Sequence, residues 1–153
     1  MSALETKIPP PLVTLITGVL MWLSNDYVSS IGVPENYRVT LAVALALIGL
    51  GCDLCGFISF RIGKTTINPL RPDTSSNLII TGIYKITRNP MYLGMAILLT
   101  GWAVHLSNII LLGWVLVFIA YITRFQIHPE ERAPDKLFGE EFANYRQRVR
   151  RWL

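Results

Sequence analysis

Three short groups of residues have side chains whose types and spacing could do chemistry. Cys52 and Cys55 form a Cys-x-x-Cys pair, residues 128–131 read His-Pro-Glu-Glu, and residues 87–94 read TRNPMYLG. The first pattern would suit redox exchange and the second a metal ion. The third places a cation, an amide, a proline, an aromatic ring and a glycine at the border between a polar loop and an apolar run. The border between water and a membrane often carries one such residue, but seldom all of them within eight positions.

The cysteine pair does not indicate redox chemistry. Cys52 and Cys55 lie within the apolar residues 39–60, without the strand–helix pattern of a thioredoxin-like site and without a second cysteine pair. We interpret them as small packing residues. Asp53 between them is less easily explained, because a carboxylate inside a membrane segment is costly and usually faces a partner or a cavity. A packing role and a cofactor-facing role for Asp53 both remain open.

The cluster at residues 128–131 does not predict a metal site. Zinc requires three or four ligands in fixed geometry, and no second histidine lies near His128 in the sequence. We therefore expect no metal.

The residues after Pro134 have the spacing of one helical face. We predict a helix on the membrane surface, either as a simple anchor or as a cover over the ends of the spans. Its apolar face would consist of Phe138, Phe142, Tyr145, Val149 and Trp152, with arginines around it.

The elements that would position these groups are apolar blocks. About half of the 153 residues are hydrophobic (52%), more than a soluble domain of this size can bury. The run 89–123 would form a helix of about 52 Å, longer than a hydrocarbon core of about 30 Å, so it must fold back at HLSN, residues 105–108. We predict spans at about 8–24, 39–60, 90–105 and 108–124. The fold class is all-α integral membrane, with four transmembrane helices in one domain over residues 1–153, a C-terminal helical hairpin, a structured cytosolic loop and an interfacial C-terminal helix.

The charges of the loops predict the orientation. Loop 61–88 holds five Lys or Arg against one Asp, and the tail after residue 123 holds seven, whereas the connection 24–38 holds two acidic residues and one basic residue. Basic loops face the cytoplasm, so both termini should be cytoplasmic. The N-terminus does not read as a cleavable signal peptide. The basic residues lie beside the spans, so we expect a membrane bilayer as partner and no nucleic acid.

Several motifs in one order carry a resemblance to a known family. TGIYKITRNPMYLG (residues 81–94), a hydrophobic hairpin, Glu130–Glu131, FGEEFANY (residues 138–145) and RVR follow one another. This series resembles the isoprenylcysteine carboxyl methyltransferase and phospholipid methyltransferase group, and the match covers about residues 65–150. The resemblance implies an integral-membrane, S-adenosyl-L-methionine-dependent methyltransferase that releases S-adenosyl-L-homocysteine. Its substrate would be a lipid or another lipophilic, membrane-resident molecule.

The resemblance also implies the cofactor-binding residues. Leu78 and Ile79 would pack near the adenine, and Tyr84 would help to close the pocket. Glu130 would meet the polar groups of the cofactor, supported by Glu131. The remaining wall would consist of Arg88, Asn89, Pro90, Met91, Tyr92 and Gly94. This site would be cytoplasmic, at a bacterial inner membrane or the endoplasmic reticulum.

Two positions depart from the family pattern. Asn89 replaces the histidine of the family's Arg-His-Pro motif. Gln126 stands four residues before Glu130, where the eukaryotic carboxyl methyltransferases have a substrate-holding arginine, and Arg124 is the nearest cation. Arg124 and Gln126 are therefore the candidates for the catalytic, acceptor-facing side. The methyl acceptor stays open among a carboxyl, an amine and a thiol.

Two other classes of protein fit parts of the sequence. One is a membrane reductase of sterol-reductase-like architecture, although such chains are usually much longer. The other is a non-catalytic small membrane protein that retains the pocket. Binding of S-adenosylmethionine would exclude the reductase, and turnover would exclude the non-catalytic protein.

Overall fold

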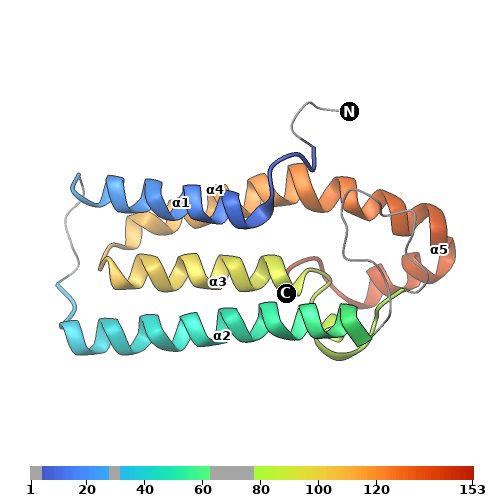
Figure 1. Ribbon diagram of the computed structural model, residues 1–153, viewed down its shortest axis with the longest axis horizontal. Coiled ribbons are helices and arrows are strands. Elements are labelled where there is room, and N and C mark those ends of the chain that lie inside the picture. The colour runs from blue at the N-terminus through green and yellow to red at the C-terminus, as the bar shows by residue number, and fades with distance from the viewer. Residues whose placement is uncertain (1–4, 28–31, 63–77) are drawn as a thin grey trace.

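The computed structural model describes residues 5–27, 32–62 and 78–153, which form helices joined by turns (Figure 1). The α-helices are α1 (Pro10–Asn25), α2 (Glu35–Ile62), α3 (Pro90–His105), α4 (Leu112–Ile122) and α5 (His128–Arg148). Shorter helical segments are η2 (Gly82–Lys85), η3 (Ile109–Leu111) and the π-helical η4 (Thr123–Ile127). No strand occurs among the described residues, so the all-helical prediction is confirmed for that part of the chain.

The turn between α3 and the following helix lies where the sequence predicts it. α3 ends at His105, and Ser107 takes a left-handed backbone conformation with φ 57°. The side chain of Asn108 then accepts a hydrogen bond from the amide of Ile110 at 3.1 Å, which caps η3. The polar residues 105–108 thus reverse the chain, because their side chains and backbone meet the hydrogen-bonding needs of both helix ends.

α3 is the central helix, since it contacts α1, α2 and α4. Its closest approach is to α2 and depends on glycine: a Cβ atom added at Gly49 would lie 2.8 Å from the carbonyl oxygen of Gly94. Small residues allow this approach between helix backbones, as they do between membrane helices. The start of α3 is thereby held against α2.

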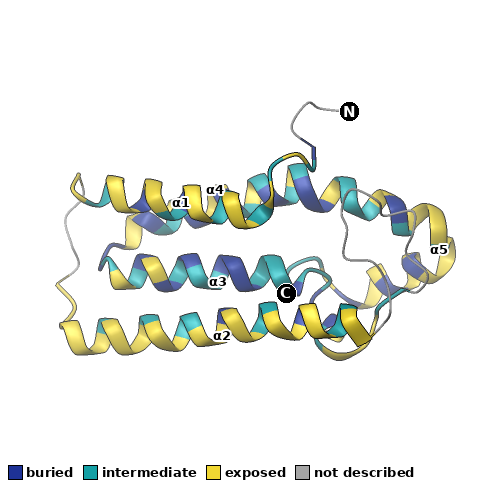
Figure 2. Ribbon diagram, in the orientation of Figure 1, coloured by how far each residue is buried: buried dark blue, intermediate teal, exposed yellow. Residues whose placement is uncertain are grey.

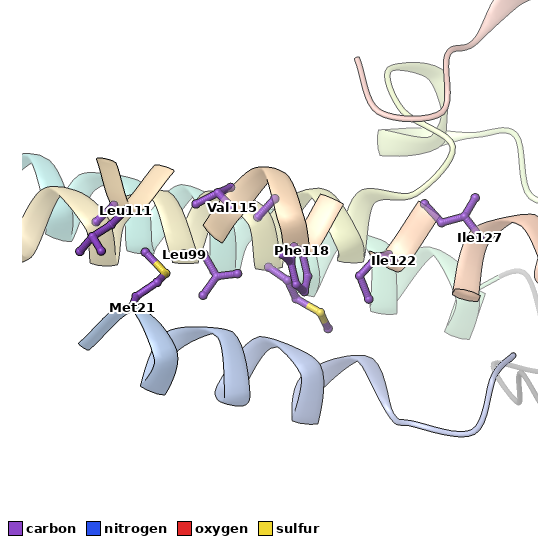
Figure 3. Packing of buried hydrophobic residues seen from close by; sticks show 10 residues of the cluster. Met21, Leu99, Leu111, Val115, Phe118, Ile122 and Ile127 are labelled. Atoms are coloured by element: carbon purple, nitrogen blue, oxygen red, sulfur yellow. The ribbon is translucent and has the colours of Figure 1, made fainter. Parts of the chain in front are cut away.

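The main hydrophobic core lies between α1, α3 and α4 (Figure 3). Met21 of α1, Leu99 of α3 and Phe118 of α4 are its buried centre, and Ile122 and Ile127 continue it toward α5. This core fixes the end of α4 relative to α3, which bears on the site because α5 follows directly.

The outer surface of the helices is apolar. The exposed fractions are 63% for Leu15 in α1, 66% for Leu47 in α2 and 67% for Leu116 in α4, and Figure 2 shows α2 exposed along most of its length. Among the described residues, two helical segments are long and apolar enough to cross a membrane, Glu35–Ile62 and the continuous stretch Ile109–Arg148, while the apolar α1 is shorter. Apolar area of this extent favours a lipid environment over water.

The helices α4 and α5 are continuous through the π-helical turn η4. A π-turn lengthens the helical hydrogen-bond loop and frequently lies at functional sites. Here the carbonyl oxygen of Phe125 accepts a hydrogen bond from the amide of Thr6 at 3.0 Å, and the Gln126 side chain donates to the carbonyl oxygen of Ile8 at 2.6 Å. The N-terminal segment, residues 5–8, is thus bound to η4.

The C-terminal region differs from the predicted single helical face. α5 already begins at His128, bends at Gly139 (φ 45°, ψ −112°) and ends at Arg148, where Val149 turns to an extended conformation (φ −121°, ψ 128°). Phe142, Tyr145 and Val149 pack together with Phe138, as the spacing predicted. Trp152 does not join them: it packs against the main core and donates its indole N–H to Thr123. The helical prediction for Val149 and Trp152 is therefore wrong, because tertiary contacts draw the chain end across the molecule.

Candidate functional site

The first turn of α3 lacks a side-chain cap in the described part of the chain. The Nδ2 atom of Asn89 donates instead to the carbonyl oxygen of Arg151 at 3.0 Å. Pro90 follows as a first helical residue, where no amide donor is needed. The free amides at such a start attract anionic groups.

Tyr92 and Glu130 connect the first turn of α3 to the first turn of α5. The Tyr92 hydroxyl donates to Glu130 Oε1 at 2.7 Å. Burial raises the pKa of the Glu130 carboxyl to about 7; the hydrogen bond from Tyr92 opposes this shift, and the neighbouring Glu131 adds to it. A carboxyl that titrates near neutral pH while facing a helix start is typical of functional sites.

Glu131 lies between two guanidinium groups. Arg88 Nη1 is 3.1 Å from Glu131 Oε1, and Arg151 approaches both carboxylate oxygens, through Nη2 at 2.7 Å and Nε at 3.3 Å. The side chains of Arg88 and Glu131 are only 10% and 16% exposed. Two cations against one carboxylate leave the group with an excess of one positive charge.

Arg88 has donors that no group in the described part of the chain satisfies with a well-aligned hydrogen bond. These donors are its buried Nε and Nη1 atoms. Burial lowers the pKa of Arg88, Glu131 raises it, and Arg151 lowers it. Unsatisfied buried donors on a charged group are costly. A bound anion would satisfy them.

An apolar and aromatic wall borders these polar groups. Tyr84 in η2 is buried, its ring meets Phe60 edge-on at 5.6 Å, and its carbonyl oxygen accepts the hydroxyl hydrogen of Tyr145 at 2.7 Å. Leu78 packs against the cluster that contains Tyr145, and Ile79 beside it is half-buried. These contacts bring the segment 78–84 against α5.

Three predicted site residues face α2. A Cβ atom added at Gly56 of α2 would meet Met91 Cγ at 2.9 Å and Pro90 Cγ at 3.1 Å. Gly94 lies against Gly49 and the carboxylate of Asp53. Pro90, Met91 and Gly94 thus hold α3 against α2, while Tyr92 reaches α5.

Arg124 and Gln126 make their described contacts with the N-terminal segment. Arg124 Nη1 is 3.7 Å from Glu5 Oε1, and its side chain is 59% exposed. Arg132 binds the same carboxylate at 3.0 Å, and the Gln126 carboxamide is engaged by Ile8. These two residues therefore lie in a different contact group from Glu130 and Glu131.

The cysteines and Asp53 occupy α2. Cys52 and Cys55 are free thiols. Among the described residues, Asp53 Oδ1 is buried without a hydrogen-bond partner.

The sequence interpretation missed the C-terminal strap, residues 149–152. The carbonyl oxygen of Arg150 accepts the amide hydrogen of Arg88 at 3.1 Å, and that of Arg151 accepts from Thr87 at 3.3 Å as well as from Asn89. The sequence signal for this segment was a basic stretch followed by Trp152. A continuous helix with Trp152 on its apolar face accounted for that pattern equally well.

Comparison with known proteins relates the sequence of this chain to a family. The family model described as phospholipid methyltransferase matches residues 37–141, more than half of the chain and including the starts of α3 and α5. Protein-S-isoprenylcysteine O-methyltransferase B of Arabidopsis thaliana is 32% identical over 131 residues, which are 84% of this chain and 57% of the plant protein. An uncharacterized protein of Haemophilus influenzae is 41% identical over 63 residues, which are 41% of this chain and 100% of that protein.

The chain thus spans little more than half the length of the plant enzyme. No solved structure matches it significantly. The match of the family model over more than half of the sequence agrees with the motif series around residues 87–94 and 130–131. The chain belongs to the phospholipid methyltransferase family.

Proposed function

We propose that the chain is an integral-membrane methyltransferase that uses S-adenosyl-L-methionine to methylate a lipophilic, membrane-resident acceptor. The family match and the name of the plant relative support methyl transfer as the reaction. The observation that carries the proposal is the convergence of Arg88, Tyr92, Glu130 and Glu131 at the first turns of α3 and α5.

The chemistry of these groups fits the cofactor. Its carboxylate would bind the unsatisfied Arg88 donors and the uncapped amides at the start of α3. Its ammonium or ribose hydroxyl groups would bind Glu130, which can act as a carboxylate near neutral pH. Leu78, Ile79 and Tyr84 would supply the apolar contact for the adenine.

When bound, S-adenosylmethionine supplies a methyl group activated by a sulfonium charge. Transfer of this methyl group to the acceptor would leave S-adenosylhomocysteine as the product. The protein's part is to hold the acceptor in line and to exclude water. Exclusion of water favours transfer to an anionic acceptor, because that transfer consumes the sulfonium charge. A carboxylate or thiolate acceptor needs no general base, whereas a protonated amine must first lose a proton.

We also propose four membrane spans with both termini and the cofactor site on the cytoplasmic side. The exposed leucines of α1, α2 and α4 support lipid contact for these helices. The basic loops support the orientation, although residues 63–77 of loop 61–88 lie outside the described part.

Arg124 and Gln126 remain our candidates for the acceptor side. Arg124 is the more exposed of the two and can offer its cation to an acceptor. Gln126 would contribute by holding the N-terminal segment, since its carboxamide already binds Ile8.

Calorimetric titration of the detergent-purified protein with S-adenosylhomocysteine tests the proposal. We expect saturable binding at one site and no comparable binding of a reduced nicotinamide cofactor, which a reductase would take. A lipid-extract screen with S-adenosylmethionine carrying a labelled methyl group should then transfer label to a lipid-soluble product. Absence of S-adenosylhomocysteine binding by folded protein would refute the proposal, and binding without any methyl transfer would favour the non-catalytic alternative.

A further inference from the structure

The C-terminal strap, residues 149–152, is bound at three places around the candidate site. Val149 is buried against the cluster of Phe142 and Tyr145, and Trp152 donates its indole N–H to Thr123 Oγ1 at 3.1 Å. Between these anchors, the strap carbonyls accept hydrogen bonds from residues 87–89. The strap therefore joins η4, α5 and the segment that enters α3.

Arg151 is the residue of the strap that contacts both sides of the site. Its backbone carbonyl accepts from Thr87 and from Asn89, the residue directly before α3. Its guanidinium binds Glu131 in the first turn of α5 through two nitrogen atoms. Planar two-point contact with a carboxylate fixes orientation as well as distance, which a lysine cannot reproduce.

The contacts of Arg151 with Glu131, together with the Arg150 carbonyl, also orient Arg88. Arg88 and Arg151 share the Glu131 carboxylate, and the Arg88 amide donates to the carbonyl oxygen of Arg150. Glu131 Oε1 already lies 3.1 Å from Arg88 Nη1, and without Arg151 the carboxylate could rotate further onto Arg88 and accept from Nε, which has no hydrogen-bond partner among the described residues. The interaction between Arg151 and Glu131 thus keeps Arg88 Nε free for a ligand.

We propose that Arg151 is a positioning residue for cofactor binding: it acts through Glu131 to orient Arg88 and through its carbonyl oxygen to orient Asn89. The C-terminal strap is then a wall of the site and more than a membrane anchor. This inference rests on the proposed function, because the cofactor is the ligand whose binding it explains.

The test is a double-mutant cycle on S-adenosylhomocysteine affinity, with Arg151→Ala, Glu131→Ala and the double variant. We expect Arg151→Ala to weaken binding about tenfold to a hundredfold, the range for losing charge-assisted hydrogen bonds. Arg151→Lys should restore part of that loss. In the Glu131→Ala background, the Arg151 substitution should change affinity less than twofold. If Arg151 acts through Glu131, the effects of the two substitutions on the binding free energy are not additive.

Arg148→Ala is the matched control. It removes the same charge from an exposed arginine at the end of α5, outside the strap. Its affinity should stay within twofold of the wild type. If Arg151→Ala loses its helical signal by circular dichroism, the cycle is repeated with Arg151→Gln and Glu131→Gln, which remove the same two charges with a smaller change in side-chain volume.

Two results would overturn the inference while leaving the proposed function intact. One is wild-type affinity in Arg151→Ala, and the other is an equal loss on adding Arg151→Ala to Glu131→Ala. Failure of the wild-type protein to bind S-adenosylhomocysteine would refute the proposed function and this inference together.

Discussion

At the scale of single residues, the properties of Glu130 come from its surroundings more than from its sequence motif. The Glu-Glu pair predicted that Glu130 binds the cofactor, but a motif cannot say how the two carboxylates differ. The structure separates them: Glu130 accepts from Tyr92, whereas Glu131 lies between Arg88 and Arg151. Burial then raises the pKa of Glu130 to about 7.

This pKa predicts how cofactor affinity depends on pH. If the ligand's ammonium or hydroxyl groups bind the carboxylate form, binding releases a proton whenever Glu130 is protonated in the free protein. The affinity for S-adenosylhomocysteine should therefore be constant above pH 7 and fall as pH drops below about 7, by up to tenfold per pH unit. Calorimetry between pH 5.5 and 8.5 measures this.

The variant Tyr92→Phe tests the same prediction. The hydrogen bond from the Tyr92 hydroxyl stabilises the carboxylate form of Glu130, so losing this bond raises the pKa of Glu130 further and moves the fall in affinity to higher pH. A Tyr92→Phe profile with the wild-type midpoint would show that another group controls binding.

At the scale of elements, the helices could be predicted from the sequence, but the π-turn between α4 and α5 and the path of the chain after α5 could not. Pro90 and the polar residues 105–108 delimit α3 at the predicted residues, because proline and turn-forming side chains act locally. The π-turn η4 and the C-terminal strap were not predictable from spacing. Trp152 has the helical period of Tyr145, and only contacts with Thr123 and Thr87, distant in sequence, take the strap away from the helix.

The α2–α3 contact predicts a loss of stability on Gly94→Ala. The added Cβ atom would overlap the carboxylate of Asp53 and the carbonyl oxygen of Gly49, and the latter belongs to the backbone, which cannot move aside as a side chain can. Overpacking of this kind costs about 1–3 kcal/mol of unfolding free energy. Gly113→Ala in α4 is the control, because its Cβ would meet nothing within 4 Å. Thermal unfolding in detergent should show a lower midpoint for Gly94→Ala and an unchanged or higher one for Gly113→Ala; equal midpoints would contradict the close contact.

Because Arg124 contacts the N-terminal segment, we expect its substitution to affect turnover and not cofactor affinity. Arg124 contacts Glu5 and makes no described contact with Glu130 or Glu131. Arg124→Ala should therefore leave S-adenosylhomocysteine affinity within about twofold and lower turnover with the acceptor about tenfold or more, as expected for a group that binds only the acceptor. Arg132→Ala, which removes the other cation bound to Glu5, is the control and should lower turnover less. Loss of cofactor affinity in Arg124→Ala would place this arginine at the cofactor instead.

At the scale of the whole molecule, the helices α1, α2, α3 and α4 lie roughly along one axis, and the candidate site lies at one end, where α5 and the strap meet the start of α3 (Figure 1). The turn at residues 105–108, the end of α1 and the start of α2 lie at the opposite end. Basic residues concentrate at the site end, which agrees with the proposed cytoplasmic side.

Four spans predict that residue 32 and the C-terminus lie on opposite sides of the membrane. Reporter fusions at the two positions measure this directly, with a periplasmic or lumenal signal at residue 32 and a cytoplasmic signal at the C-terminus. Reporters on the same side would rule out the four-span arrangement while leaving the helices themselves unchanged.

The central claim is that the first turns of α3 and α5 bind the methyl donor. Its most direct test is the S-adenosylhomocysteine affinity of Glu130→Gln at pH 8, where Glu130 is ionised. Loss of a charge-assisted hydrogen bond should weaken binding about tenfold to a hundredfold. Glu141→Gln removes the same charge from an exposed position of α5 and should bind like the wild type. Equal affinity of the wild type and both variants would contradict the assignment of the site.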